Sequence, residues 1–547
     1  MPPNKIKVGF LIDSFFVPAW VHETFKRITE SNYAFAVVVI KKEGGVSTFK
    51  GFNYIAYNLY GKISRKYTKI RPKAFLKKNA TEFFKDVPVL EVKTSLQNGA
   101  SHLQEHDINT IKGYGLDVLI KFGFNKLGGG VLSAAACGVW TFDNEKIYGS
   151  AGTNAGVWEV VKGSCATPIT LRILADTEPE KVLYQSFSTT GISISKCQGL
   201  ACWKAVSFIP RRLKELYEFG TEAFLQNIRD YSKSINLKGQ PANPPANGKF
   251  ITYLFSRYSK WIGRKIWGLN NQEQWLLLYH FNDQNKLPDL SVTDFKYKEI
   301  IPPSSKFWAD PCVFKNSDGK YFIFFEEYVY KRKKAHLSVL EIDKDGTISK
   351  PQIVLEKPYH LSYPFILTEG NDIYMIPETS ENKTIEIYKC VSFPDKWEFQ
   401  MNLMENIHAV DTTIHFYNNK YWLFVNIKEN KGGSAWDELF LFSADTLLTQ
   451  NWRPHPQNPI ISDVRQSRPA GHLIEHEGKL YRPSQDCSCS YGYATNMNEI
   501  ITLNEKEYKE KTVTKLLPKW NKKAMAVHTL SSRDGLAVLD ARYKSKK

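Results

Sequence analysis

A repeat of about 50 residues in the second half of the chain restricts its fold more than any other feature. Each unit begins with a short apolar strand, and a second strand follows about ten residues later across a turn such as Asn-Ser-Asp-Gly. The five units begin at Asp310, Tyr363, Asp411, Pro469 and Ala526. This period in a sequence of short strands is typical of β-propeller blades. We therefore predict an all-β five-bladed propeller over residues 271–547, with residues 275–280 helping the last blade to close the ring.

The first half has a different pattern, in which apolar strands alternate with helical stretches. Residues 7–12, 35–40 and 116–122 are strand-like runs, and residues 20–30 have the pattern of a helix. Continuous apolar strands that alternate with helices are typical of a parallel sheet covered on both faces. We predict an α/β domain with a mostly parallel sheet over residues 1–235.

Residues 236–270 connect the two predicted domains. Residues 238–248 are rich in Pro, Asn and Gly and indicate a linker, and residues 249–268 contain five basic residues and no acidic one. On a helical wheel, Lys249, Arg257, Lys260 and Arg264 share one arc, and Phe250, Leu254, Tyr258, Trp261, Ile262 and Ile266 fall on the adjoining arc. A basic amphipathic helix of this kind suits an anionic membrane surface, but a helix packed between domains has the same pattern. Both interpretations stay open.

Composition and charge narrow the class of protein. Hydrophobic residues make up 42% and charged residues 24% of the chain, as in ordinary globular proteins. The longest apolar run, residues 33–40, is far shorter than the ~20 residues of a membrane span, and the N-terminus lacks the apolar stretch of a signal peptide. We expect a cytoplasmic protein, peripheral on the inner membrane face if the basic helix binds there. The net charge of +17 favours anionic partners, but the basic residues are scattered and nucleic acid is not an expected partner.

The strand starts of the predicted propeller supply the candidate site residues. In a propeller the first strand of each blade lines the central channel, so the residues that open these strands converge. We predict catalytic roles for Asp310, Glu378 and Asp411, and substrate-binding roles for Tyr363, Arg468, Asp486 and His528. Paired carboxylates can perform acid–base chemistry on a glycosidic bond, whereas Asp residues at strand starts also cap backbone amides. No CxxC pair occurs, and no metal site is predicted.

The propeller region resembles two known families. Ala309-Asp310-Pro311 is similar to the strand that carries the base or nucleophile of furanosidases of the arabinanase and invertase kind, and Asp411 to their supporting Asp. Residues 300–540 also resemble the N-terminal domain of plant glucosamine inositolphosphorylceramide transferases, through residues 309–311, 360–365, 375–378, 410–413 and 481–487. The resemblance implies a sugar, glycolipid or nucleotide-sugar ligand. Glycosyl transfer does not carry over, because the catalytic domain of those transferases has no counterpart here. The carboxylate order also departs from that of the furanosidases, which speaks against hydrolysis.

The first half resembles a formyltransferase domain, a family that passes a formyl group from 10-formyltetrahydrofolate to an amine. The resemblance covers residues 5–220, through residues 117–125, 131–132, 138–140, 156–160, 170–174 and 182–184. It places Thr141, Asp143 and Glu178 where the family has its catalytic Asn, His and Asp. All three identities are changed, and a carboxylate with a pKa near 4 cannot act as the same acid–base near neutral pH. The resemblance therefore implies a degenerate formyltransferase-like domain, with 10-formyltetrahydrofolate as cofactor only if that domain is active.

Three functions remain open at this point. The first is a glycan-directed protein of surface-polysaccharide or glycolipid assembly, whose propeller pocket binds or modifies a sugar. The second is an active amino-sugar N-formyltransferase. The third is a non-catalytic two-domain scaffold. If the protein is an enzyme, these features favour a transferase over a hydrolase.

Overall fold

The computed structural model describes residues 4–43, 54–66, 73–124, 126–142, 156–175, 180–235, 244–282, 287–288, 290 and 295–546. The chain divides into two compact units, which we describe separately. The N-terminal unit comprises residues 1–259 with residues 430–434, and the C-terminal unit comprises residues 260–429 and 435–547. Residues 238–243 of the predicted linker lie outside the described residues.

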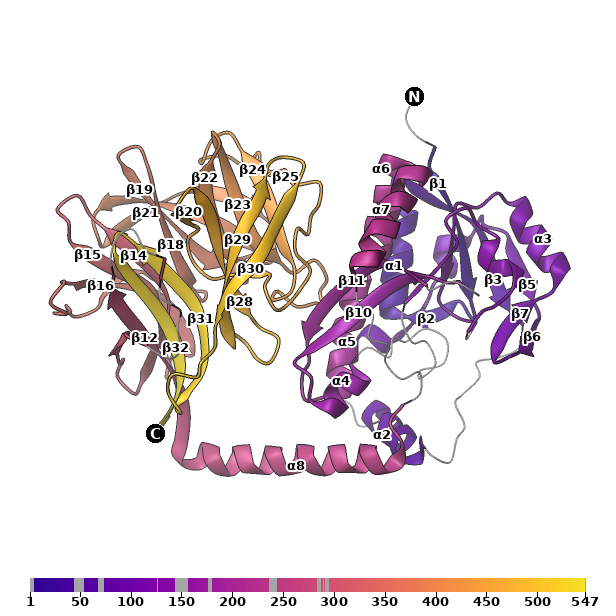
Figure 1. The fold of residues 1–547 in the computed structure, drawn as a ribbon, viewed down its shortest axis with the longest axis horizontal. Coiled ribbons are helices and arrows are strands. Elements are labelled where there is room, and N and C mark those ends of the chain that lie inside the picture. The colour runs from indigo at the N-terminus through magenta and orange to yellow at the C-terminus, as the bar shows by residue number, and fades with distance from the viewer. Residues whose placement is uncertain are drawn as a thin grey trace. The chain divides into compact units, whose positions relative to one another are not determined.

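A seven-stranded sheet with the order β11-β10-β9-β8-β1-β3-β5 forms the centre of the N-terminal unit (Figure 1). Its strands are β1 (Ile6–Ile12), β3 (Ala34–Lys42), β5 (Val89–Val92), β8 (Val118–Lys121), β9 (Val139–Phe142), β10 (Ala166–Ile173) and β11 (Lys181–Thr189). All neighbours from β9 to β5 run parallel, and β10 and β11 form an antiparallel hairpin at one edge. The predicted mostly parallel sheet is thus present. Its central strands β8 and β9 are buried along their whole length because their side chains are largely apolar.

Helix α1 (Ala19–Thr29) shows how the sequence positions helices on this sheet. Val21, Phe25 and Ile28 recur at steps of four and three and are buried. Trp20 is also buried, and Trp20 and Phe25 each meet the ring of Phe122 edge to face. The other helices of the unit are α2 (Ile55–Lys66), α3 (Glu105–Gly113), α4 (Val157–Lys162), α5 (Ile194–Ala205), α6 (Phe208–Phe219) and α7 (Thr221–Ser234). Two short ribbons complete it, β2 (Phe16–Pro18) with β4 (Lys77–Asn79) and β6 (Thr94–Gln97) with β7 (Ala100–Leu103).

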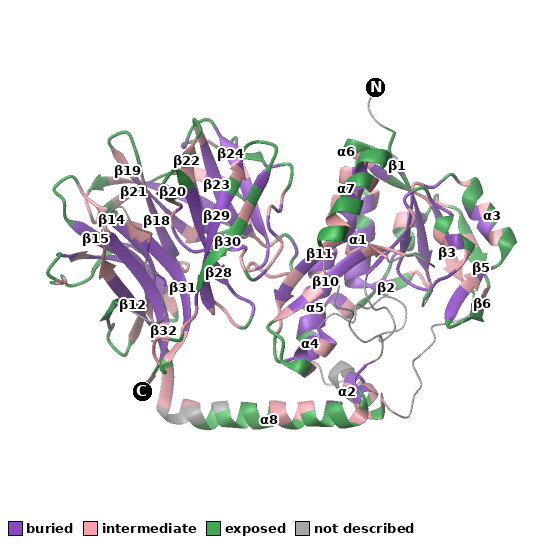
Figure 2. Cartoon of the chain, in the orientation of Figure 1, coloured by how far each residue is buried: buried purple, intermediate pink, exposed green. Residues whose placement is uncertain are grey.

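The basic amphipathic segment forms the helix α8 (Asn247–Asn270), close to the predicted bounds. Near its beginning the buried ring of Phe250 lies edge to face against Tyr57 and Tyr60 of α2. Asn247 also accepts a hydrogen bond from the Ala56 amide. Much of the rest of α8 is exposed (Figure 2). Among the described residues no helix is both long enough and apolar enough to cross a membrane.

The C-terminal unit is a propeller of five sheets, which we number as blades 1 to 5. Blade 1 contains β14 (Lys306–Lys315), β15 (Tyr321–Val329), β16 (Lys334–Ile342) and β17 (Gln352–Leu355). Blade 2 contains β18 (Ser362–Glu369), β19 (Asp372–Thr379), β20 (Thr384–Ser392) and β21 (Lys396–Glu405), and blade 3 contains β22 (Ala409–Tyr417), β23 (Lys420–Ile427), β24 (Leu439–Ala444) and β25 (Arg453–Pro454). Blade 4 contains β26 (Arg468–Pro469), β27 (Ile474–His476), β28 (Lys479–Asp486), β29 (Ala494–Leu503) and β30 (Tyr508–Leu516). Blade 5 contains β31 (Ala524–Arg533), β32 (Leu536–Lys546), β12 (Asn271–Phe281) and β13 (Lys298–Ile300).

An apolar cluster fills each space between neighbouring blades and so holds the ring together. Blades 1 and 2, 2 and 3, 3 and 4, 4 and 5, and 5 and 1 each share one cluster of buried side chains. The ring closes within blade 5, where β12 pairs along its whole length with β32, from Asn271 opposite Lys546 to Phe281 opposite Leu536. The prediction of a five-bladed propeller, including a closing role for residues 275–280, is confirmed by this topology.

Candidate functional site

A β-bulge interrupts the first strand of four of the five blades at corresponding positions. The pairing with the second strand shifts between Ala309 and Cys312, Ser362 and Phe365, Val410 and Thr413, and Val527 and Leu530. The bulged residues are Asp310, Tyr363, Asp411 and His528, each with the residue that follows it. Bulges re-aim side chains and are over-represented beside active sites. Asp310, Tyr363 and Asp411 also have positive φ angles, +52°, +46° and +52°, a conformation that non-glycine residues rarely adopt.

The bulge of blade 5 connects to blade 1 through a buried histidine. His528 Nε2 lies 3.0 Å from Asp310 Oδ1, and His528 Nδ1 lies 2.7 Å from Asp540 Oδ1. Asp540 Oδ2 accepts a hydrogen bond from the Asp310 amide at 2.8 Å. All three side chains are buried, so the imidazole and two carboxylates form one network across the two blades.

An arginine holds a second pair of carboxyl groups in blades 2 and 3. The Arg468 guanidinium, from blade 4, forms a two-pronged ion pair with Asp411, and its Nη2 lies 3.7 Å from Glu378 Oε2. Gln485 Nε2 donates to Asp411 Oδ2 at 2.7 Å. Glu378 Oε2 is buried and has no hydrogen-bond partner among the described residues. A buried acceptor left over in this way is available to a ligand.

Aromatic rings pack against both cations of the site. The Arg468 guanidinium lies 4.9 Å from the centroid of the Tyr491 ring, and Tyr491 meets His528 edge to face. Trp275 lies 4.3 Å from His528, centroid to centroid. Stacking of this kind stabilises buried cations and fixes their orientation.

Blade 4 can approach blade 5 closely at residue 471 only because that residue is glycine. Gly471 has a φ of +130°, and a Cβ atom there would lie 2.0 Å from the Leu530 carbonyl oxygen of blade 5. The Gly471 amide donates a hydrogen bond to the Tyr363 hydroxyl at 2.8 Å, and the same hydroxyl lies 2.8 Å from Thr413 Oγ1. Tyr363 thus connects blades 2, 3 and 4.

The carboxyl groups of the site have pKa values displaced in opposite directions. Burial acts to raise the pKa of Asp310, but the charge and hydrogen bond of His528 outweigh it and leave that pKa below its ordinary value. Burial, followed by the charge of Asp411, raises the pKa of Glu378 well above its ordinary value. Burial and the charge of Asp310 do the same for Glu326 on β15. The site therefore combines a carboxyl group whose pKa is lowered with two whose pKa values are raised, the division of pKa values that acid–base chemistry uses.

His528 is a cation held between two carboxylates. Burial acts to lower its pKa, but the charges of Asp540 and Asp310 raise the pKa to about 10. These three residues are also the one group in the described chain whose ligand atoms, all within 4.8 Å of one another, could hold a metal ion. A metal would need the neutral imidazole, so at neutral pH it would have to displace a proton that the two carboxylates stabilise.

The structure brings together six of the seven propeller residues predicted from the sequence. Asp310, Glu378, Asp411, Arg468, His528 and Tyr363 are connected by the contacts described above. Asp486 is placed in a different contact, where it pairs with Lys515 on β30 and accepts from the Ser488 amide.

Glu326, Gln485 and Asp540 belong to the site but were not predicted from the sequence. Glu326, Glu378, Asn426 and Gln485 occupy matching positions on the second strands, opposite Ala309, Ser362, Val410 and Arg468. Alignment of the repeat units on Glu378 would have identified Glu326. Asp540 on β32 has no such signal in its own repeat unit.

Of the three formyltransferase-equivalent positions, only Thr141 lies among the described residues. Its side chain is buried within β9, opposite Arg172 of β10. Asp143 and Glu178 lie outside the described residues. A buried threonine on a central strand does not supply the amide or the imidazole that formyl transfer uses, so this position does not fit a site for 10-formyltetrahydrofolate.

Two other titratable groups lie at the carboxyl edge of the parallel strands. Asp13 follows β1 and accepts a hydrogen bond from the Phe124 amide at 2.8 Å. Lys121 ends β8, and its burial lowers the pKa to about 7 against the opposing charges of Asp13 and Glu180. Ligands of open α/β sheets bind at this edge.

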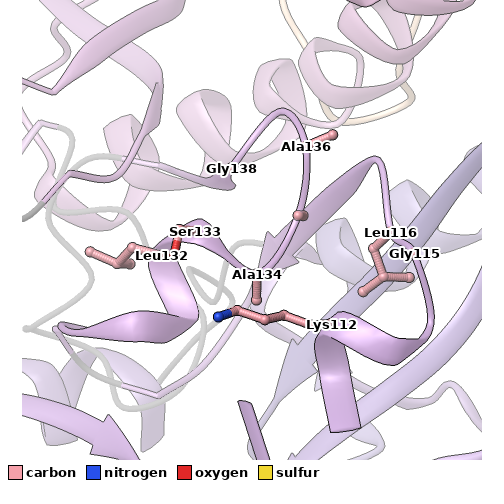
Figure 3. A pocket seen from close by; sticks show the side chains of 9 residues that line it. Lys112, Gly115, Leu116, Leu132, Ser133, Ala134, Ala136 and Gly138 are labelled. Carbon is pink, nitrogen blue, oxygen red and sulfur yellow. The ribbon is translucent and has the colours of Figure 1, made fainter. Parts of the chain in front are cut away.

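A shallow pocket of about 430 Å³ lies at the opposite edge of the same sheet (Figure 3). Leu116 precedes β8 and Gly138 precedes β9, so the lining lies at the amino ends of these strands. Lys112 supplies the one charged side chain of the lining. The pocket is therefore separate from Thr141 and Lys121.

The family match described next falls within the propeller. Residues 292–540 match the family model described as the N-terminal domain of glucosamine inositolphosphorylceramide transferase 1. The transferase of that name from Oryza sativa subsp. japonica is 33% identical over 209 residues, which are 38% of this chain and 28% of the relative. The one from Arabidopsis thaliana is 30% identical over 208 residues, 38% of this chain and 27% of the relative. The matched segment spans less than a third of these relatives.

Similar solved structures include a family 117 glycoside hydrolase of Zobellia galactanivorans, at 10% identity and a TM-score of 0.32 over 50% of this chain and 90% of that chain. A GH43 β-xylosidase/α-arabinofuranosidase from a compost metagenome has 12% identity and a TM-score of 0.33 over 45% of this chain and 92% of that chain. The buried network of ion pairs lies entirely within residues 310–540. The part of the chain that carries the candidate site is thus similar to the N-terminal domain of glucosamine inositolphosphorylceramide transferase 1.

Proposed function

We propose that this is a glycan-directed protein of surface-polysaccharide or glycolipid assembly, and that its propeller site binds or modifies a sugar. The observation that carries the proposal is the convergence of Asp310, Glu326, Glu378 and Asp411 around two buried cations. Buried charges are costly to a fold unless they are paired, so a merely structural centre would be expected to be apolar. The match of this segment to a domain of a transferase named for glucosamine and inositolphosphorylceramide supports the same class of ligand.

The contacts of the cations favour a sugar's hydroxyl or amino groups over its phosphate. Arg468 is engaged by Asp411, and His528 is held between Asp310 and Asp540. The charge of each cation is therefore already balanced by carboxylates, which disfavours a phosphate beside it. Glu378 offers an unused carboxyl oxygen, to which a sugar hydroxyl or amino group can donate. A glycolipid or a nucleotide sugar would therefore enter with its sugar end.

If the site performs chemistry, the displaced pKa values assign the roles. Asp310 is the carboxylate with the lowered pKa and is suited to act as base or nucleophile. Glu378 has a raised pKa and is suited to donate a proton. Asp411 holds Arg468 in place beside Glu378 and is suited to a positioning role.

A thermal-shift screen of the full chain tests the proposal. Neutral sugars, amino sugars and nucleotide sugars are added to the wild type and to Glu378→Gln, because a ligand that binds the native state raises the melting temperature. Gln keeps the shape of the Glu378 side chain and replaces one carboxyl oxygen with an amide group that donates hydrogen bonds and does not accept them. We expect a sugar to stabilise the wild type and the shift to be lost in Glu378→Gln. The matched control is Asp345→Asn, a fully exposed carboxyl group in blade 1.

Two results would count against a sugar site at the propeller centre. One is a sugar-dependent shift that persists in Glu378→Gln and also in Asp310→Asn. The other is the absence of any shift in the wild type across the whole panel, which would favour the scaffold function.

For the N-terminal unit we propose a formyltransferase-like scaffold whose formyl-transfer site is degenerate. The changed identities at Thr141, Asp143 and Glu178 support this, as does the burial of Thr141. The alternative is an active amino-sugar N-formyltransferase, for which Lys121 and Asp13 at the carboxyl edge of the sheet are the groups in its favour. A folate analogue added to the full chain separates the two, because only the active enzyme is expected to be stabilised by it.

A further inference from the structure

Two helices that pack on each other, α2 and α8, expose a concentration of large apolar side chains. Of the 24 large hydrophobic residues that are exposed in the described chain, nine lie on these two helices. They are Ile55, Leu59 and Ile63 on α2, and Ile251, Phe255, Tyr258, Trp261, Ile262 and Ile266 on α8. Single exposed hydrophobics are normal, but a contiguous group indicates a binding surface.

The exposed residues form a stripe on each helix. On α8, residues 251, 255, 258, 262 and 266 recur at steps of three and four, so they fall within one arc of the helix. Phe255 is 76% exposed, and Ile266 is 64% exposed. On α2, residues 55, 59 and 63 recur at steps of four, and each is about half exposed. We call these two sets the apolar stripes.

The contacts between the helices leave the stripes uncovered. Phe250 of α8 packs against Tyr57 and Tyr60 of α2, and Arg257 lies 3.4 Å from the Tyr60 hydroxyl. None of these contact residues belongs to a stripe. These contacts between the two helices therefore involve residues other than those of the stripes, and the stripe residues stay exposed.

The sequence around the stripes is basic and contains no acidic residue. Helix α8 carries five basic residues and no Asp or Glu, and residues 44–81, which include α2, carry nine basic residues and no Asp or Glu. Lys265 lies 4.6 Å from the Trp261 ring centroid, beside the stripe of α8. Apolar residues with Trp on one face and Lys and Arg on the other are the features of helices that lie in the plane of an anionic membrane.

We propose that α2 and α8 form a surface that binds an anionic lipid bilayer, with the apolar stripes inserted among the headgroups. The positive charge of both segments is complementary to such a lipid surface, and an uncharged or basic protein partner would leave it unused. The proposal does not depend on the sugar site, because it concerns other elements of the chain.

The test is sedimentation of the full chain with vesicles of phosphatidylcholine alone and of phosphatidylcholine mixed with phosphatidylglycerol. We expect the wild type to bind the anionic vesicles and to be released as salt concentration rises. Phe255→Glu with Ile262→Glu, and separately Leu59→Glu with Ile63→Glu, should each lower the partition coefficient by at least about tenfold. Lys260→Glu with Lys265→Glu should lower binding to anionic vesicles and leave the weak binding to neutral ones unchanged.

The matched control is Phe416→Glu, which introduces the same charge at a half-exposed aromatic residue of β22, outside the stripes. Circular dichroism checks that each variant is folded. The proposal is overturned if the wild type does not bind anionic vesicles, if the stripe variants bind like the wild type, or if Phe416→Glu loses as much binding as they do. It is also overturned if, without lipid, the chain forms a dimer that Phe255→Glu with Ile262→Glu dissociates, because the stripes would then be a protein interface.

Discussion

At the residue scale, the ionised His528 makes a prediction about pH. Its pKa is raised to about 10 in the folded protein, above the ordinary value near 6.5 of an unfolded chain. The stabilisation from its charge is therefore complete below pH 6.5 and is lost as the pH rises towards 10. We expect the free energy of unfolding to fall by a few kcal/mol over this range.

His528→Asn should be less stable than the wild type at pH 6 and should lose this part of the pH dependence. Chemical denaturation of both proteins at several pH values measures the effect. His476→Asn, on the short strand β27, is the control and should retain the wild-type slope. An equal slope in His528→Asn and the wild type would show that His528 is not the titrating group.

Tyr363 makes a second prediction at this scale. Its hydroxyl accepts the Gly471 amide hydrogen and contacts Thr413, so Tyr363→Phe leaves a buried amide without its partner. We expect a loss of about 1–3 kcal/mol in the free energy of unfolding. Tyr481→Phe removes a hydroxyl for which no hydrogen bond is found within the described part of the chain, and it should cost much less. Similar losses in both variants would contradict the proposed connection between blades.

At the scale of elements, the bulges predict which substitutions the inner strands tolerate. Asp411 has a φ of +52°, which Asn tolerates and β-branched residues do not. Asp411→Val should therefore destabilise the protein by about 1–3 kcal/mol more than Asp411→Asn. Melting curves of the two variants measure the difference, with Phe416→Val and Phe416→Asn as a matched pair at an exposed position on the regular part of β22. Equal melting temperatures for the two Asp411 variants would show that the backbone conformation carries no cost.

The bulges also explain how far the sequence could predict the site. The repeat of strands and turns placed Asp310, Asp411 and His528 on inner strands, because period and turn residues are local signals. The role of Asp540 could not be predicted, because its partner His528 stands on a neighbouring strand whose register is set by a bulge. Asp486 follows Gln485 directly, and the alternation of side chains along β28 turns it to Lys515 instead of the centre.

At the scale of the whole propeller, closure of the ring by β12 and β32 predicts where a crosslink would stabilise it. Gln272 and Ser545 are register partners near one end of these strands, and almost the whole propeller lies between them in sequence. A disulfide between cysteines at both positions should stabilise the unit by about 2–4 kcal/mol. Denaturation of the oxidised and reduced double variant, with Gln272→Cys as control, measures this. A disulfide confirmed by mass spectrometry that leaves stability unchanged would show that closure does not limit unfolding.

The two domain types and the closure of the ring could be predicted because each depends on a periodic pattern of strands, turns and helices along the sequence. A long run of blades and a run of alternating strands and helices are patterns of period, which do not depend on the contacts of any one residue. The exposure of α8 could not be predicted, because an amphipathic pattern does not say which face is covered. Only the contact of Phe250 with α2 showed which part of the helix is buried and which is not.

The bulges of the inner strands have a consequence for how such propellers evolve. A bulged residue stands outside the regular ladder of backbone hydrogen bonds, so its side chain can be exchanged without altering the register of the strands on either side. Here four bulges carry an aspartate, a tyrosine, an aspartate and a histidine on one repeated scaffold. A lineage can therefore change the specificity of the centre through a handful of substitutions while its blades continue to be inherited intact.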